Sequence, residues 1–143
     1  MFKVSKMLIE DCEKIKDKFD EFDDFWSFEN LESELKAENR EYIVAKDGKE
    51  IVGFAGIIIS LDDAEITNIV TKKDRRREGI GNALLNELIR ISKEKGKDNL
   101  SLEVNEENEY AIRLYEKNGF QVLGRRKKYY NNTNDALIMT KYF

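Results

Sequence analysis

Residues 69–89 read IVTKKDRRREGIGNALLNELI, and this stretch decides how the rest of the chain is interpreted. A β-like segment runs into three arginines at 75–77, then Gly79-Ile80-Gly81, and then apolar residues at helical spacing. Three interpretations compete for this basic, glycine-containing turn: a nucleic-acid contact, an ordinary solvated helix start, and a cradle for a phosphate-bearing cofactor.

The physics of a helix start favours the cradle. The first turn leaves about four N–H groups unpaired at the positive end of the helix dipole, and an anion satisfies both. Gly79 and Gly81 remove Cβ atoms where a ligand approaches, and Arg76 and Arg77 add charged donors. Glycines without a function would each cost about 1 kcal/mol relative to alanine. The motif lacks the third glycine of a dinucleotide fingerprint and the Gly-Lys-Ser/Thr of a Walker loop.

Apolar spacing divides the rest of the chain into strands and helices. The predicted strands are 2–5, 41–46, 50–60, 64–71, 100–104 and 120–124, followed by two strands within 125–140 around an Asn-rich turn. The predicted helices are 8–22, 25–35 with Ser27 as N-cap, 79–95 and 110–119. This order predicts an α/β (α+β) fold in one domain, residues 1–143, with a mixed sheet and helices on both of its faces.

Composition excludes several function classes. The net charge of −4 argues against a general nucleic-acid binder. The chain has no His and only one Cys, so we expect no metal and no His-based triad. No apolar run approaches the roughly 20 residues of a membrane span, and the start lacks a signal peptide's apolar core. We therefore expect a cytoplasmic protein that makes no membrane contact.

At this point the sequence resembles the GNAT acetyltransferase superfamily. Arg76-x-x-Gly79-x-Gly81 after a strand is similar to that superfamily's acyl-CoA pyrophosphate loop. Residues 65–89, 100–120 and 125–139 follow one another as in the bacterial ribosomal-protein alanine N-acetyltransferases. The resemblance covers roughly 62–139, whereas the first 60 residues match mainly in pattern and length.

The resemblance implies a GNAT fold and a reaction. The implied fold is a mostly antiparallel central sheet of six to seven strands flanked by about four helices. The implied reaction moves an acetyl group from acetyl-CoA to the N-terminal α-amino group of a protein. The implied partner is the N-terminal segment of an alanine-starting small-subunit ribosomal protein.

Two residues match the family's acid–base pair. A protein α-amino group has a pKa of about 7.7–8.0, so a carboxylate base acting directly or through water is sufficient. Glu103 matches that base and alternates away from the apolar face of LSLEV; its alternative is a solvent-facing strand residue. Tyr115 matches the general acid that protonates the leaving thiolate; its alternative is core packing.

The resemblance also implies a coenzyme-binding set. Loop members are Arg76, Arg77, Glu78, Gly79, Ile80, Gly81 and Asn82. Asn108 matches a CoA contact and also reads as a helix N-cap. The main chain of Ile69, Val70 and Thr71 matches the segment that binds the acetyl and pantetheine portion, and its N–H groups are natural oxyanion donors.

Other interpretations remain open at this stage. The chain could acetylate a small amine such as a polyamine or antibiotic, or be a non-catalytic acyl-CoA-binding or nucleic-acid-binding module. The presence of both Glu103 and Tyr115 argues against a catalytically inactive member of this superfamily. Trp26 either shapes a peptide entrance or packs a helix junction, and the basic run at 125–128 either grips phosphate or is an exposed strand face.

Overall fold

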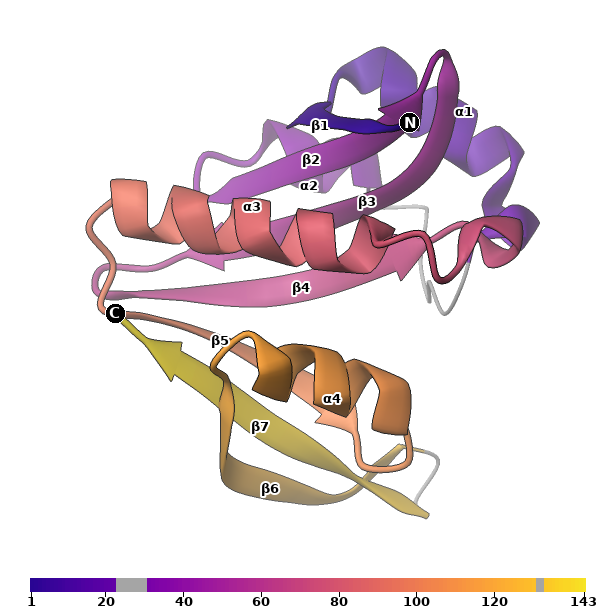
Figure 1. Cartoon of the computed structure of the whole chain (residues 1–143). Coiled ribbons are helices and arrows are strands. Elements are labelled where there is room, and N and C mark those ends of the chain that lie inside the picture. Colours follow the sequence, from indigo (N-terminus) through magenta and orange to yellow (C-terminus); the bar gives the residue numbers. More distant parts are fainter. Residues whose placement is uncertain (23–30, 131–132) are drawn as a thin grey trace.

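The strands of this chain form one sheet, and the helices cover both of its faces (Figure 1). The structure, a computed structural model, describes residues 1–22, 31–130 and 133–143. Its strands are β1 Lys3–Lys6, β2 Arg40–Asp47, β3 Glu50–Ile59, β4 Asp63–Thr71, β5 Asn99–Asn105, β6 Gln121–Tyr130 and β7 Asn134–Tyr142. Its helices are α1 Ile9–Asp17, α2 Leu31–Lys36, α3 Ile80–Glu94 and α4 Glu109–Lys117, with 3₁₀ turns at Phe19–Glu21 and Lys73–Arg75.

The strands lie in the order β1-β2-β3-β4-β5-β7-β6, and each neighbouring pair is antiparallel except β4 and β5. Helix α3 joins β4 to β5, because a parallel pair needs a long crossover. This mixed, mostly antiparallel sheet, with the four α-helices of the described residues, confirms the predicted fold class. No helix in the described part of the chain is long and apolar enough to cross a bilayer.

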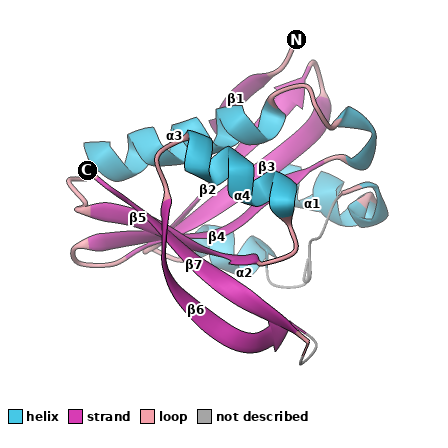
Figure 2. Ribbon diagram, turned by 60° about the horizontal axis from the view of Figure 1, so that its bottom comes forward, coloured by secondary structure: helices cyan, strands magenta, loops and turns pink. Residues whose placement is uncertain are grey.

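Alternation along the strands sends side chains into two apolar layers, one on each face of the sheet. On β2, Tyr42 and Val44 join the layer beside α1 and α2, whereas Ile43 and Ala45 join the layer beside α3 and α4. Figure 2 shows α3 and α4 on the same side of the sheet. Helix α3 is fixed there by a buried stripe that contains Ile80, Leu84, Leu85, Leu88, Ile89 and Ile91.

Strands β4 and β5 pair over a short parallel stretch and then separate, so the sheet is split between them at one end. Their register covers only Asp63–Glu65 opposite Asn99–Ser101. Beyond these residues the two strands diverge toward the end of the molecule where α3 begins (Figure 1). β4 also carries one extra residue, Thr67, between the partners of Ile57 and Gly56. Such a bulge bends a strand and increases its local twist.

The first predicted helix, 8–22, is too long. Helix α1 ends at Asp17, and the chain continues through the 3₁₀ turn to Phe22. Phe22 makes an antiparallel bridge with Lys72 and packs edge-on against Phe54, with 5.5 Å between ring centroids. A bridge needs extended backbone, so the α-helix cannot continue to Phe22.

The predicted break between 120–124 and 125–130 is also wrong, because both belong to the single strand β6. Leu123 is an extra residue between the partners of Met139 and Ile138, so the strand passes the irregularity without ending. The prediction of a helix over 25–35 with Ser27 as N-cap falls largely outside the described residues, which show α2 beginning at Leu31.

Gly56 is the position at which this sheet tolerates a side chain least. A Cβ atom there would lie 2.4 Å from the ring of Tyr42, which is buried opposite it on β2. We expect Gly56→Ala to lower the free energy of unfolding by about 1–3 kcal/mol, the usual cost of overpacking. Gly124→Ala is the matched control, since its Cβ would meet Ile138 at an ordinary 3.4 Å. Urea unfolding measures both; equal losses would contradict the steric explanation.

Candidate active site

The turn between β4 and α3 has an unusual backbone. Arg77 has a φ of 66° and Gly79 a φ of 83°, so both adopt the left-handed conformation. For a non-glycine residue this conformation costs about 1–2 kcal/mol, so contacts elsewhere must hold the turn. Residues 76–79 are exposed to solvent, while Ile80 is buried and anchors the first turn of α3.

The start of α3 differs from the starts of α1 and α4 in its capping. At α4, Asn108 Oδ1 accepts a hydrogen bond from the Ala111 N–H at 3.2 Å, which confirms the predicted N-cap. At α1, Asp11 Oδ2 accepts from the Leu8 N–H at 2.8 Å. The N-cap of α3 is Gly79, which has no capping side chain, and the first turn contains no acidic residue. The N–H groups and the dipole of α3 are therefore suited to an external anion.

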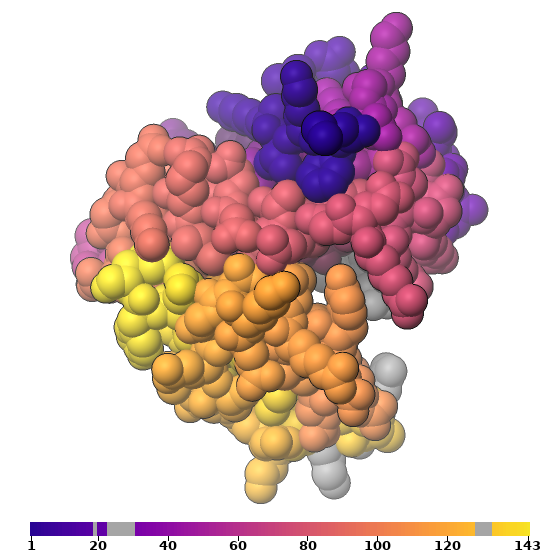
Figure 3. Space-filling model, viewed as in Figure 1, coloured from indigo at the N-terminus to yellow at the C-terminus, as the bar shows by residue number. Residues whose placement is uncertain are grey.

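Helix α4 contacts the start of α3. The helix that carries Tyr115 therefore lies beside the predicted phosphate-binding turn. Asn118 Nδ2 donates to Asn82 Oδ1 at 3.0 Å. A Cβ atom on Gly81 would lie 3.6 Å from Leu114 Cδ2 and 3.9 Å from Thr71 Oγ1. The space-filling view shows the surface hollowed between the turn before α3 and the segment leading into α4 (Figure 3).

Glu103 lies on β5 and faces away from the apolar layer that holds Leu102 and Val104, as alternation predicted. Its side chain is 23% exposed, and its Oε1 lies 2.8 Å from Nη2 of Arg126 on β6. Sequence reasoning did not find this ion pair, because the two residues lie on strands separated by β7. A carboxylate held at an open part of the sheet can accept a proton from an approaching amine.

Tyr115 lies on α4 and is partly buried. Its ring packs against the layer beside α3 and α4 and lies 5.9 Å from the ring of Phe120. The residue before it, Leu114, is the one that a Cβ on Gly81 would touch. The ring therefore has a packing role, and the predicted role of its hydroxyl is chemically separate from that role.

Ile69, Val70 and Thr71 occupy the last part of β4, where the strand pairs with β3 on one side. The ladder with β5 stops at Glu65, before these residues begin. The β5 side of this strand end therefore borders the gap that the diverging strands create. An extended ligand can pair with main-chain groups at such an edge.

A cluster of charged residues that the sequence did not predict surrounds the same turn. We call Glu21, Asp47, Glu50, Lys72, Arg75 and Glu78 the loop ion cluster. Arg75 donates to Asp47 Oδ2 at 2.7 Å, to Glu50 Oε1 at 3.0 Å, and to both oxygens of Glu78 at 2.8 and 3.0 Å. Lys72 donates to Glu50 and lies 3.1 Å from Glu21. The side chain of Glu78 is thus bound to Arg75.

These contacts shift the pKa of four groups. The hydrogen bond from Arg75 lowers the pKa of Asp47, and the hydrogen bond from Lys72 lowers the pKa of Glu50. The same bonds act in reverse on the cations. Glu50 raises the pKa of Lys72, and Glu78, followed by Asp47, raises the pKa of Arg75.

The lowered carboxyl pKa values predict a loss of stability in acid. A group whose pKa is lower in the folded state stabilises the protein above its unfolded pKa, which is about 3.9 for Asp and 4.3 for Glu. That stabilisation disappears as the pH falls through the folded pKa. We expect the urea midpoint of the wild type to decline below about pH 5, and less steeply in Asp47→Asn, whose side chain no longer titrates. Parallel curves would contradict a contribution from Asp47.

The basic run on β6 is partly used within the protein. Arg125 Nη1 lies 3.0 Å from Glu106 Oε1 and 2.7 Å from Asp135 Oδ2, and Arg126 pairs with Glu103. These pairs support the strand-face interpretation for the first two positions. Trp26 and its neighbours lie outside the described residues.

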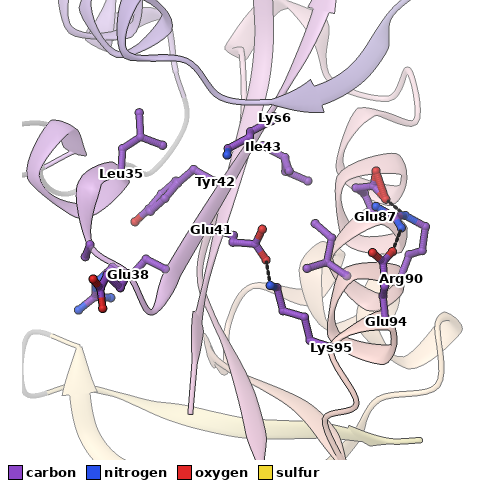
Figure 4. A pocket seen from close by; sticks show the side chains of 13 residues that line it. Lys6, Leu35, Glu38, Glu41, Tyr42, Ile43, Glu87, Arg90, Glu94 and Lys95 are labelled. Atoms are coloured by element: carbon purple, nitrogen blue, oxygen red, sulfur yellow. Dashed lines mark hydrogen bonds and ion pairs between the residues drawn. The ribbon is translucent and has the colours of Figure 1, made fainter. Parts of the chain in front are cut away.

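Two hollows in the described part of the chain lie away from the predicted site residues. One, of about 440 Å³, is lined by β2, α2 and α3 and contains an ion pair of 3.5 Å between Glu41 and Lys95 (Figure 4). The other, of about 540 Å³, lies beside α1 and the hairpin and is bordered by Glu50 and Lys72 of the loop ion cluster. The predicted site residues lie instead along the end of β4, where its ladder with β5 has stopped, and at the start of α3.

Comparison with known proteins agrees with the predicted family and fold. The model of the acetyltransferase (GNAT) family matches residues 6–120. A Bacillus subtilis (strain 168) protein, provisionally named a [ribosomal protein bS18]-alanine N-acetyltransferase, is 38% identical over 140 residues, which cover 95% of this chain and 92% of that protein. The crystal structure of the ribosomal-protein-S18-alanine N-acetyltransferase from Escherichia coli has a TM-score of 0.90 at 30% identity, covering 99% of this chain and 94% of that one.

A more distant neighbour shares the fold alone. The crystal structure of a GNAT family acetyltransferase from Elizabethkingia anophelis, with acetyl-CoA bound, has a TM-score of 0.73 at 20% identity. It covers 99% of this chain and 98% of that one. The family match and the close relatives confirm the predicted class of enzyme, and this chain belongs to the GNAT family of acetyltransferases.

Proposed function

We propose that this enzyme transfers the acetyl group of acetyl-CoA to the N-terminal α-amino group of a ribosomal protein that begins with alanine. The observation that carries the proposal is the uncapped start of α3 beside the opening between β4 and β5. The relatives from Bacillus subtilis and Escherichia coli support the choice of substrate, since their names specify a ribosomal protein alanine.

The coenzyme is expected to extend from the start of α3 along the end of β4. Its diphosphate would accept hydrogen bonds from main-chain N–H groups around Gly79–Asn82, with Arg76 and Arg77 adding positive charge. Its pantetheine arm would pair with the main chain of residues 69–71 on the side that faces β5, and Asn108 would contact it from the start of α4. Helix α4, which carries Tyr115, lies beside the start of α3, since a Cβ atom on Gly81 would be 3.6 Å from Leu114.

The proposed reaction needs one base and one acid. Glu103 accepts a proton from the α-ammonium group, directly or through water, and the neutral amine attacks the thioester carbonyl. Main-chain N–H groups at 69–71 stabilise the oxyanion of the tetrahedral adduct. The adduct nitrogen loses its second proton to water. When the adduct collapses, the carbon–sulfur bond breaks and the Tyr115 hydroxyl gives its proton to the CoA thiolate, after which the phenolate takes a proton from solvent. The products are an acetylated N-terminus and CoA.

The substrate assignment can be tested with a panel of amines. Peptides beginning with Ala, Ser, Met and N-acetyl-Ala, together with a polyamine, are incubated with acetyl-CoA and the enzyme and analysed by mass spectrometry. We expect one acetyl group on the Ala peptide and none on the peptide whose terminus is already blocked. Acetylation of the polyamine with no peptide product would instead assign the enzyme to small-molecule amines.

Gly81 separates coenzyme binding from stability. Among the described residues its added Cβ would meet Leu114 and Thr71, both at ordinary contact distances, so the fold accepts alanine there. We expect Gly81→Ala to stabilise α3 by up to about 1 kcal/mol, since alanine is the better helix former. We expect the same change to weaken acetyl-CoA binding by about ten-fold or more, because the methyl group intrudes where a diphosphate approaches the backbone. Thermal unfolding and calorimetry measure the two effects, and unchanged acetyl-CoA affinity would contradict the placement.

A further inference from the structure

Arg75 faces the body of the protein, unlike the two arginines that follow it. Its side chain is 20% exposed and lies against carboxylates from three places: Asp47 at the end of β2, Glu50 at the start of β3, and Glu78 in its own turn. Arg76 and Arg77 are exposed. With three carboxylates as its neighbours, the Arg75 guanidinium is not directed at an external phosphate.

The contacts of Arg75 fix the turn in two ways. Glu78 lies between the left-handed residues Arg77 and Gly79, so the bidentate Arg75–Glu78 bond closes the turn on itself. Asp47 and Glu50 then attach the closed turn to the β2–β3 hairpin. Lys72, just after β4, adds a second attachment to the hairpin. Its side chain donates to Glu50, and its main-chain N–H donates to the Val52 carbonyl at 2.9 Å.

We propose that Arg75 is a positioning residue for the coenzyme: it does not touch acetyl-CoA, but holds the turn so that the first N–H groups of α3 point at the diphosphate. The proposal rests on the proposed function of this turn. Bidentate Arg–carboxylate bonds supply both the energy and the fixed geometry that a strained turn needs. Lysine cannot reproduce this contact, because it is a single point of charge.

A competing explanation is that Arg75 attracts the phosphates by its charge alone. The two explanations predict opposite changes in acetyl-CoA affinity when Asp47 is replaced by Asn. Asp47→Asn removes a negative charge near the site. Simple electrostatics therefore predicts tighter binding of acetyl-CoA. The positioning role predicts weaker binding, because the turn loses one of its attachments to the hairpin.

The experiment is calorimetric titration of acetyl-CoA into the full-length wild type and the variants Arg75→Lys, Asp47→Asn and the double variant. Arg90→Lys is the matched control, since Arg90 is an exposed arginine of α3 whose ion pairs with Glu87 and Glu94 lie within that helix. We expect each of the two single variants to weaken acetyl-CoA binding by about ten-fold, and the control to bind as the wild type does. The affinity loss of the double variant should be smaller than the product of the two single losses. In steady-state assays, KM for acetyl-CoA rises while kcat changes little.

Three outcomes are distinguishable. The positioning role is supported if both single variants bind acetyl-CoA more weakly and the double variant loses less affinity than the product of the two single losses. Wild-type affinity in Arg75→Lys, or tighter binding in Asp47→Asn, overturns it in favour of charge alone. If the folded wild type itself does not bind acetyl-CoA, the proposed function fails, and the positioning role fails with it. Thermal unfolding of each variant identifies any loss that comes from misfolding.

Discussion

Replacing Glu103 by Gln is expected to lower kcat by roughly 10²- to 10⁴-fold, the usual contribution of a general base. The amide cannot accept the proton, so the variant depends on substrate that is already neutral. A protein α-amino group has a pKa of about 7.7–8.0, so the fraction of neutral amine rises with pH up to that range. We therefore expect the residual activity to increase more steeply with pH than that of the wild type, while the acetyl-CoA affinity persists.

Two control variants separate chemistry from structure. Glu107→Gln removes an exposed carboxylate just beyond β5 and should leave the rate unchanged. Arg126→Gln breaks the 2.8 Å ion pair but keeps the Glu103 carboxylate. If Arg126→Gln lowers kcat as much as Glu103→Gln does, the ion pair rather than the proton acceptor is what matters. Unchanged turnover of Glu103→Gln at pH 7 would remove Glu103 from the mechanism.

Tyr115→Phe is the second change with a large expected effect. It deletes one hydroxyl and keeps the ring that packs near Phe120. We expect kcat to fall by roughly 10²-fold or more, because the thiolate then leaves without a proton donor, while the melting temperature changes little. Stopped-flow measurement of thiol release, combined with thermal unfolding, checks both parts.

Tyr110→Phe is the matched control for this variant. Tyr110 lies on the same helix and is 67% exposed, so loss of its hydroxyl should alter neither rate nor stability. If Tyr115→Phe instead lowers the melting temperature strongly and keeps the rate of the folded fraction, the packing interpretation is correct.

Features fixed by local patterns could be predicted from the sequence. The alternation of LSLEV places Leu102 and Glu103 on opposite faces of β5, as the structure shows. The helical spacing after Gly79 defines α3 and its buried stripe. The Asn108 cap depends on residues three apart, so it too could be predicted. Each of these depends on contacts within one turn or one strand.

Features that depend on distant pairs could not be predicted. The sequence assigned phosphate contacts to Arg76 and Arg77 and no role to Arg75, and only the fold shows that Asp47 and Glu50 lie beside it. The Glu103–Arg126 pair requires β7 between β5 and β6, an order that no local pattern encodes. The end of α1 is set by the bridge from Phe22 to Lys72, fifty positions away in the chain. These three features depend on which distant segments lie side by side, and local sequence patterns do not specify that.

The central claim is that the start of α3 binds the diphosphate of the coenzyme. Calorimetry that compares acetyl-CoA with acetyl-pantetheine, which has the thioester and the arm but no diphosphate, tests it most directly. We predict that acetyl-pantetheine binds about 100-fold or more weakly, since several charge-assisted hydrogen bonds are lost. Equal affinities for the two compounds would contradict the claim.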